Sequence, residues 1–244
     1  MKKIIWIDVG THFGQEFMSI FGSNFYFAIL SIRRFLADRI FRREERLSFL
    51  DFKSIIKSRS EISKKSESFF SIFIEANPKI IASKKLYLRA NSVFNIALTS
   101  ADDDEKILKL YLGNKDELSQ GSSIFLEKHN VSSDSYVASF GVSPKKFLSK
   151  LKDHIEDSME NYEVMLRLNC EGVEDDTIYA AHEVFGAKLK LISGSLKDVK
   201  DIKGNHAYNN LIKFMSDNNL SFVYFSSNII SWKEAYLKIS KLLK

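Results

Sequence analysis

A short apolar run near the N-terminus constrains the fold of this chain more than any other segment. It extends from Lys3 to Ile7, ends in the carboxylate of Asp8, and is followed by a turn that contains Gly10 and Gly14. The residues after this turn have helical spacing. A buried strand that leads through a glycine turn into a helix is typical of the first unit of an α/β domain, in which ligands bind beyond the carboxyl ends of the strands.

The spacing of the turn excludes two common ligand-binding loops. A dinucleotide-binding loop has the pattern Gly-x-Gly-x-x-Gly, whereas His12 and Gln15 occupy its second and third glycine positions. No Gly-Lys-Ser/Thr sequence follows, so a nucleotide P-loop is absent from this segment. The spacing Asp-x-Gly-x-x-x-Gly suits a cofactor without a pyrophosphate, such as S-adenosylmethionine. An ordinary strand-to-helix turn is the alternative interpretation.

Strand-like and helix-like segments alternate along the chain. Buried strands are expected at residues 3–8 and 69–74, and another strand at 164–170, with further strand-like patterns at 86–98, 105–112, 136–140, 188–192 and 221–225. Helices are expected at residues 15–21, 25–46, 48–59, 143–157, 174–185, 206–218 and 230–243, and loops at 58–68 and 113–135. This alternation predicts an α/β fold with a Rossmann-like, doubly wound, mostly parallel sheet, in a single domain over residues 1–244.

The composition argues against a membrane-spanning, a secreted and a zinc-binding protein. No apolar run approaches the roughly 20 residues of a transmembrane helix, and Asp8 interrupts the N-terminal run where a signal peptide would continue. A single cysteine, Cys170, fits a reducing cytoplasm, and no Cys/His cluster has the spacing of a zinc site. The sequence therefore predicts a cytoplasmic domain with no metal site and no transmembrane segment.

The net charge of +5 lies in one part of the chain. Residues 31–67 hold eleven Lys/Arg and six Asp/Glu, whereas the remainder holds 25 of each. The unit between Asp8 and Glu75 is also about twice as long as a plain strand-helix-strand unit. We therefore expect residues 23–67 to be a basic helical insertion after the first strand.

Three interpretations of the arginines in this segment remain open. They could cover the solvated face of a lid or dimer helix, bind an anionic acceptor such as a phosphorylated or nucleotide-linked sugar, or contact membrane lipid peripherally. Specific nucleic-acid binding is not expected, because the basic and aromatic strand pattern of an RNA-recognition sheet is missing. The arginines concerned are Arg33, Arg34, Arg39, Arg42, Arg43 and Arg46.

Polar turns follow three of the expected strands, at residues 8–14, 75–78 and 169–174. In a parallel sheet these turns meet at one edge. A carboxylate after the second strand can accept hydrogen bonds from both ribose hydroxyls of an adenosine-type cofactor, and Glu75 is the candidate for this role. Alternatively, Glu75 caps the helix that starts near Pro78, because anions are stabilised at helix N-termini.

Five motifs resemble those of the FkbM family of S-adenosylmethionine-dependent methyltransferases, and they occur in the family's order over residues 4–175. Residues 7–15 (Ile-Asp-Val-Gly-Thr-His-Phe-Gly-Gln) resemble its Ile-Asp-Val-Gly-Ala-Asn-x-Gly-Gln motif, and residues 75–78 (Glu-Ala-Asn-Pro) resemble Glu-Pro-Asn-Pro. Residues 95–99 (Asn-Ile-Ala-Leu-Thr) are similar to Asn-x-Ala-Leu-Ser, and residues 121–124 (Gly-Ser-Ser-Ile) to Gly-Ser-Ser-Leu. Residues 167–174 (Arg-Leu-Asn-Cys-Glu-Gly-Val-Glu) resemble Lys-Ile-Asp-Val-Glu-Gly-Ala-Glu.

The resemblance implies a class I methyltransferase fold and methyl transfer from S-adenosylmethionine to a hydroxyl, on a sugar or glycan precursor. It implies a set of cofactor-binding residues: Asp8, Gly10, His12 and Gly14 for the methionine end, Glu75 for the ribose, and Asn77, Asn95 and Ala97 for the adenosine. It places Glu171 at the acceptor. Because Glu171 and Glu174 flank Gly172 at a strand end, both are candidates for a general base or a ligand of the acceptor hydroxyl. A helix N-terminal role in complementing the helix dipole is the alternative for both.

The chain departs from the family pattern at three positions. His12 replaces an asparagine, Arg167 replaces a lysine, and Asn169 replaces an aspartate. An asparagine cannot act as a base. Two other functions therefore remain open: a non-catalytic cofactor-binding module that interacts through the basic insertion, and a small-molecule transferase with a different nucleotide ligand.

Overall fold

A six-stranded parallel sheet forms the centre of the molecule. The computed structural model describes residues 2–41, 48–82, 90–100, 105–113, 121–226 and 229–243, except the side chains of residues 33–41. The strand order is β3-β2-β1-β7-β8-β9, and every neighbouring pair is parallel. The strands are β1 (Lys3–Val9), β2 (Phe69–Ile74), β3 (Ser92–Phe94), β7 (Tyr162–Leu168), β8 (Leu189–Gly194) and β9 (Phe222–Tyr224). The predicted Rossmann-like α/β fold is confirmed at this level, and its strand order reverses between β1 and β7, where such folds bind ligands.

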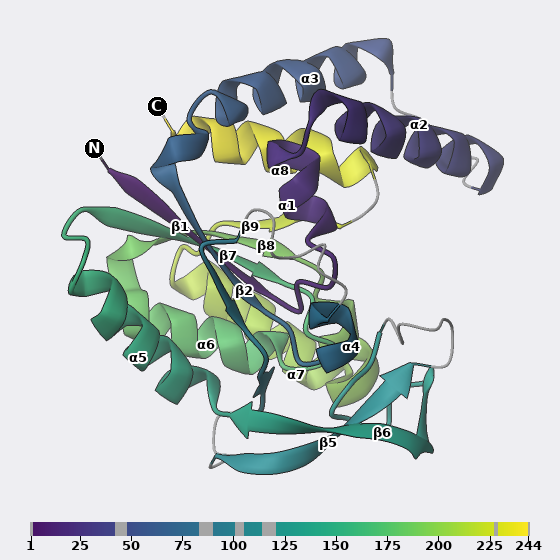
Figure 1. Cartoon of the computed structure of the whole chain (residues 1–244), viewed down its shortest axis with the longest axis vertical. Helices are drawn as coiled ribbons and strands as arrows, with labels where there is room; N and C mark the ends of the chain where they lie inside the picture. The colour runs from purple at the N-terminus through teal and green to yellow at the C-terminus, as the bar shows by residue number, and fades with distance from the viewer. Residues whose placement is uncertain are drawn as a thin grey trace.

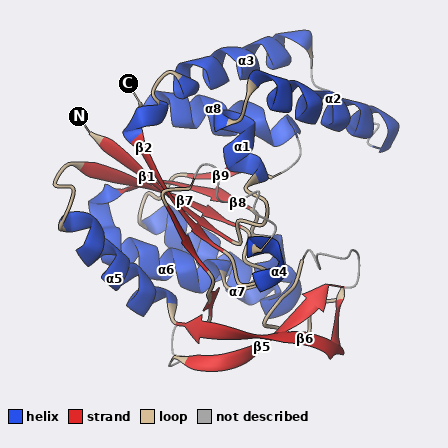
Figure 2. Cartoon of the chain, in the orientation of Figure 1, coloured by secondary structure: helices blue, strands red, loops and turns tan. Residues whose placement is uncertain are grey.

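Helices cover both faces of this sheet (Figure 2). On one face lie α1 (Gln15–Phe21), α2 (Asn24–Phe41), α3 (Phe49–Ser63) and α8 (Ile229–Leu242), and on the other lie α5 (Pro144–Glu156), α6 (Glu174–Phe185) and α7 (Lys197–Asp217). The short helix α4 (Pro78–Ile81) follows β2. None of the helices in the described part of the chain is long and apolar enough to cross a membrane.

The central strand β1 shows why the sheet has two cores. Every residue from Ile4 to Val9 is buried, as expected for a parallel strand with helices on both faces. Ile5 and Ile7 point into the cluster beneath α5, α6 and α7, whereas Trp6 points into the aromatic cluster beneath α1. This alternation follows from the two-residue period of a strand.

A second, three-stranded sheet lies beside the carboxyl ends of the central strands (Figure 1). It contains β4 (Ala97–Leu98), β5 (Lys106–Gly113) and β6 (Val131–Val142); β5 and β6 are antiparallel, and β4 is parallel to β6. The sequence did not predict this sheet. β6 begins inside the expected loop 113–135 because its first residues pair with β5, although they lack an apolar pattern. Residues 114–120 of that loop lie outside the described residues.

Three boundaries differ from the sequence prediction. The expected strand-like segment 86–98 contains two short strands, β3 and β4, which belong to different sheets, and its residues 86–89 lie outside the described part. Helix α7 begins at Lys197 rather than near residue 206, with a kink at Gly204, whose φ is 86°. The expected loop 58–68 is helical up to Ser63 in α3.

Packing against α8 and α1 explains why α3 continues through that expected loop. Ser240 in α8 donates a 2.6 Å hydrogen bond to the Glu61 carboxylate. Arg59 is buried and donates to the carbonyl oxygens of Ser19 (2.9 Å) and Gly22 (2.6 Å) at the end of α1. At least one basic residue of the segment 23–67 therefore holds the helices together. Residues 42–47, at the end of the expected helix 25–46, lie outside the described part.

Candidate functional site

A cavity of about 310 Å³ lies beyond the carboxyl ends of β1, β2 and β7. It therefore occupies the position at which the strand order reverses. The hairpin β5–β6 borders it through Leu110 and residues 121–124. Six of the residues predicted from the sequence line the cavity: Gly10, His12, Glu75, Asn77, Ala97 and Glu171. The other four, Asp8, Gly14, Asn95 and Glu174, surround it without lining it.

The turn between β1 and α1 requires glycine at position 10 for a reason that the sequence did not reveal. Gly10 has a φ of 68°, and a Cβ atom there would lie 2.0 Å from the carbonyl oxygen of Asn169. The close approach is therefore to the end of β7. Gly14 also has a positive φ, 61°, but its Cβ would make only ordinary contacts, with Phe73 at 3.5 Å and Thr11 at 3.7 Å. Its conformation, rather than space, favours glycine there.

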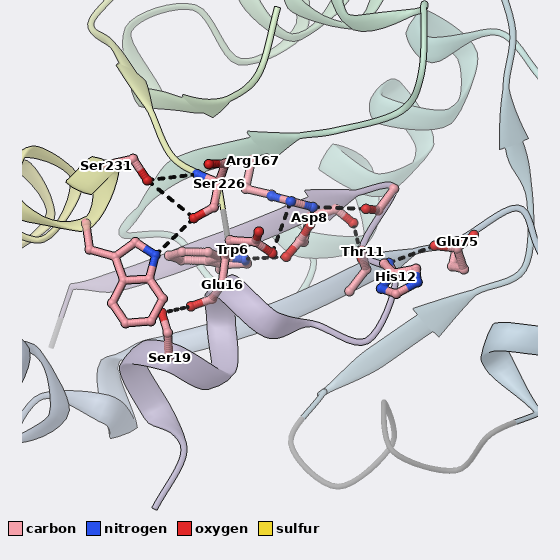
Figure 3. Close-up of polar contacts among 12 residues, drawn as sticks. Trp6, Asp8, Thr11, His12, Glu16, Ser19, Glu75, Arg167, Ser226 and Ser231 are labelled. Atoms are coloured by element: carbon pink, nitrogen blue, oxygen red, sulfur yellow. Dashed lines mark hydrogen bonds and ion pairs between the residues drawn. The ribbon is translucent and has the colours of Figure 1, made fainter. Parts of the chain in front are cut away.

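Asp8 belongs to a buried charge network with Arg167 (Figure 3). Arg167 Nη1 donates to Asp8 Oδ1 at 3.0 Å and to the Gly10 carbonyl oxygen at 2.9 Å. Arg167 Nη2 lies 3.0 Å from Glu16 Oε2. Burial raises the pKa of Asp8 to about 6, and Arg167 opposes that effect. Asp8 therefore fixes the guanidinium in place rather than facing the cavity itself.

Arg167 and Glu16 line the cavity, and the sequence interpretation had not assigned them a role there. Burial alone would lower the pKa of Arg167, but the charges of Glu16 and Asp8 raise it above its ordinary value. The guanidinium therefore stays charged. The sequence did contain a signal for this pair. An arginine in a buried strand needs a partner of opposite charge, and an acidic residue follows the glycine turn in the first turn of the helix.

The Glu75 carboxylate is held by two backbone amides. Its Oε2 accepts from the His12 N–H at 2.7 Å and its Oε1 from the Asn77 N–H at 2.9 Å. Burial raises the pKa of Glu75, and these two hydrogen bonds oppose the increase. A carboxylate has about four lone-pair positions, so each oxygen can accept a further hydrogen bond. Glu75 is therefore oriented towards the cavity and retains capacity for a ligand.

The residues around Glu75 have supporting roles. The helix cap of α4 is Asn77, whose side chain accepts from the Lys79 N–H at 3.0 Å, so the alternative that Glu75 caps this helix is wrong. Asn95 Nδ2 donates to the carbonyl oxygens of Glu75 (2.8 Å) and Ala76 (3.2 Å). Asn95 therefore fixes the backbone of this turn from outside the cavity.

Glu174 holds the turn after β7. Its Oε1 accepts from the N–H groups of Cys170 (2.9 Å) and Glu171 (2.8 Å), and its Oε2 accepts from Gly172 (2.9 Å). The side chain is completely buried, and burial raises its pKa to about 7. This arrangement is that of a loop-positioning residue and gives Glu174 no contact with the cavity.

Glu171 faces the cavity from the same turn, with a φ of 63°. Its carboxylate forms an ion pair with Lys128, whose side chain is 6% exposed, and Asp198 lies 3.9 Å from the same ammonium. Ser123 Oγ donates to the Glu171 carbonyl oxygen at 2.9 Å. Lys128 was missed because it lies in a stretch that the sequence indicated to be a loop.

The described charges on the cavity wall are mostly negative, since Glu16, Glu75 and Glu171 outnumber Arg167. The backbone amides of His12, Asn77 and residues 170–172 all donate to protein carboxylates. In phosphate-binding sites such amides face the ligand instead. Within the described part of the chain, no group of three His, Cys, Asp or Glu side chains could hold a metal ion.

Comparison with protein-family models, with curated proteins and with solved structures finds no match to this chain. The family resemblance therefore continues to depend on the five sequence motifs alone.

Proposed function

We propose that this chain is an S-adenosylmethionine-dependent methyltransferase that acts on a hydroxyl group. The observation that carries the proposal is the electrostatics of the cavity. Its turn amides are bonded to Glu75 and Glu174, and three of the four charged side chains on its described wall are carboxylates. A ligand with several phosphates would find repulsion and few donors. A phosphate-free adenosine cofactor with a cationic sulfonium is complementary to this wall.

The residues present fit such a cofactor. Glu75 would accept hydrogen bonds from the ribose hydroxyls, because its two oxygens keep free lone pairs beside the cavity. Ala97 and Leu98 provide apolar wall on the β4 side. The methionine end would lie near Gly10, beside the Glu16–Arg167 ion pair, whose two charges are complementary to its ammonium and carboxylate groups. The bound cofactor would supply an electrophilic methyl group.

The acceptor would bind on the Glu171 side. Methyl transfer depends mainly on aligning the attacking oxygen with the methyl group. Glu171 is rigidly placed by its pair with Lys128, so it would accept a hydrogen bond from the acceptor hydroxyl and orient it. Glu174 would act indirectly, by fixing the backbone of residues 170–172. A sugar or glycan precursor remains the proposed acceptor class.

One observation favours a second candidate, a cofactor-binding module without transfer activity. Asn169 lines the cavity at the position where the resembled family has an aspartate, and an amide cannot accept a proton from the acceptor. Cofactor binding alone does not distinguish such a module from an enzyme. Transfer of the labelled methyl group of S-adenosylmethionine to water or to an acceptor hydroxyl by the purified protein would identify the enzyme.

The test is thermal unfolding with S-adenosylhomocysteine, which stabilises the folded chain if it binds there. We expect a clear increase in melting temperature for the wild type and for Glu183→Ala, a surface control in α6. We expect a clearly smaller increase for Glu75→Ala, because the loss of hydrogen bonds to a charged group weakens binding by about 1–3 kcal/mol. No shift for the folded wild type at millimolar ligand would contradict the proposal.

A further inference from the structure

Helix α2 exposes an apolar stripe. Phe25, Ile29 and Ile32 are 75%, 41% and 59% exposed, and Ala28 between them is exposed as well. The four positions have the i, i+3, i+4, i+7 spacing that places side chains on one face of a helix. The opposite side of the helix is already used, since Phe27 and Ser31 are buried. The helix therefore presents one apolar face to the molecule and another to the solvent.

The far end of this helix, towards Phe41, projects beyond the rest of the molecule (Figure 1). At the start of the next helix, Phe49 and Leu50 are 82% and 74% exposed. Isolated exposed apolar residues are common and need no explanation, but an ordered stripe of them marks a docking surface.

The positive charge of the segment that contains α2 indicates which kind of partner this face binds. By sequence, residues 25–46 contain six arginines and three acidic residues, a net charge of +3, and are called the basic segment below. A second copy of the chain docked through the same face would bring two basic segments together, which opposes association. An anionic surface that also accepts apolar side chains is complementary both to the exposed apolar stripe and to the positive charge.

We propose that α2 docks the protein on an anionic lipid membrane. The stripe of Phe25, Ala28, Ile29 and Ile32 enters the boundary between headgroups and acyl chains, and the basic segment is attracted to the negative surface potential. A stripe of this length gives reversible, peripheral binding. The inference is independent of the proposed methyltransferase activity, because none of these residues lines the cavity.

Vesicle co-sedimentation tests the inference. Phosphatidylcholine vesicles are compared with vesicles in which about a third of the lipid is phosphatidylserine. We expect the wild type to bind the anionic vesicles at least about tenfold more strongly than the neutral ones, and to be released by high salt. The triple variant Phe25→Ser, Ile29→Ser, Ile32→Ser should lose at least about tenfold in binding. The matched control is the triple variant Ile107→Ser, Leu126→Ser, Ile212→Ser, which changes exposed apolar residues elsewhere and should bind like the wild type.

Melting temperatures of both variants show whether each is folded. Should the stripe variant fail to fold, Phe25→Trp serves instead, and its fluorescence should shift to the blue with anionic vesicles only. Three results would overturn the inference: no preference for anionic vesicles, unchanged binding by the folded stripe variant, or a wild-type dimer in sedimentation that the stripe variant abolishes. The last result would assign the stripe to a second copy of the chain.

Discussion

The substitution Glu174→Gln tests the role assigned to Glu174, through the dependence of stability on pH. In the folded chain burial raises the pKa of this carboxyl from its ordinary 4.5 to about 7. As the pH rises, the unfolded chain therefore releases this proton before the folded chain does. Stability from this group is fully present below about pH 4.5 and is lost as the pH approaches 7, an effect of about 3 kcal/mol.

The variant replaces this titrating group by a neutral amide. Glutamine has one acceptor oxygen, so at least one of the amides of Cys170, Glu171 and Gly172 loses its partner, at a cost of about 1–3 kcal/mol. We therefore expect Glu174→Gln to be less stable than the wild type near pH 5, and the difference to shrink or reverse near pH 8.

Urea unfolding across this pH range, followed by circular dichroism, measures the difference. The control Glu183→Gln changes an exposed carboxylate in α6 and should keep the wild-type pH dependence. A constant difference between Glu174→Gln and the wild type at every pH would refute the reasoning, because it would mean that Glu174 has the same pKa in the folded and unfolded chains.

Four further substitutions have expected outcomes in equilibrium unfolding. Gly10→Ala should cost more stability than Gly14→Ala, because the new Cβ at position 10 would lie 2.0 Å from the Asn169 carbonyl oxygen. At Gly14 the cost comes only from the positive φ and is about 1–2 kcal/mol. Equal costs for the two variants would contradict the described contact. Arg59→Ala should lose about 2–4 kcal/mol, because two buried carbonyl oxygens at the end of α1 lose their donor, and a loss under about 0.5 kcal/mol would show that this end is solvated. Arg167→Met should cost about 3–5 kcal/mol of stability at neutral pH, because it leaves Asp8 buried without its cation. Lowering the pH should recover part of that stability, because Asp8 becomes protonated. A loss of stability that does not depend on pH would argue against this ion pair.

The central sheet could be predicted because its strands carry local signals. Continuous apolar runs such as 3–8 and 69–74 are typical of parallel strands with two covered faces. The second sheet could not be predicted, because the first part of β6 is stabilised by pairing with β5 rather than by an apolar pattern of its own. The end of α3 was misjudged for a similar reason, since Arg59 and Ile62 are buried by helices far away in the sequence.

The candidate site was predictable to the extent that strand ends meet at one edge of a parallel sheet. That rule brings Gly10, Glu75 and Glu171 to one cavity. It does not say where each side chain points, and Glu174 turns inward to the backbone of its own loop. It also could not identify Lys128, whose pairing with Glu171 depends on the path of a long irregular segment.

The central claim is that the cavity binds a phosphate-free adenosine cofactor. Calorimetric titration of one protein preparation with S-adenosylmethionine, S-adenosylhomocysteine and ATP tests it most directly. The arrangement of Glu16, Glu75 and Arg167, with the turn amides bonded to protein carboxylates, predicts saturable binding of the first two ligands and none of ATP in the same concentration range. Binding of ATP without binding of either sulfur compound would contradict the account.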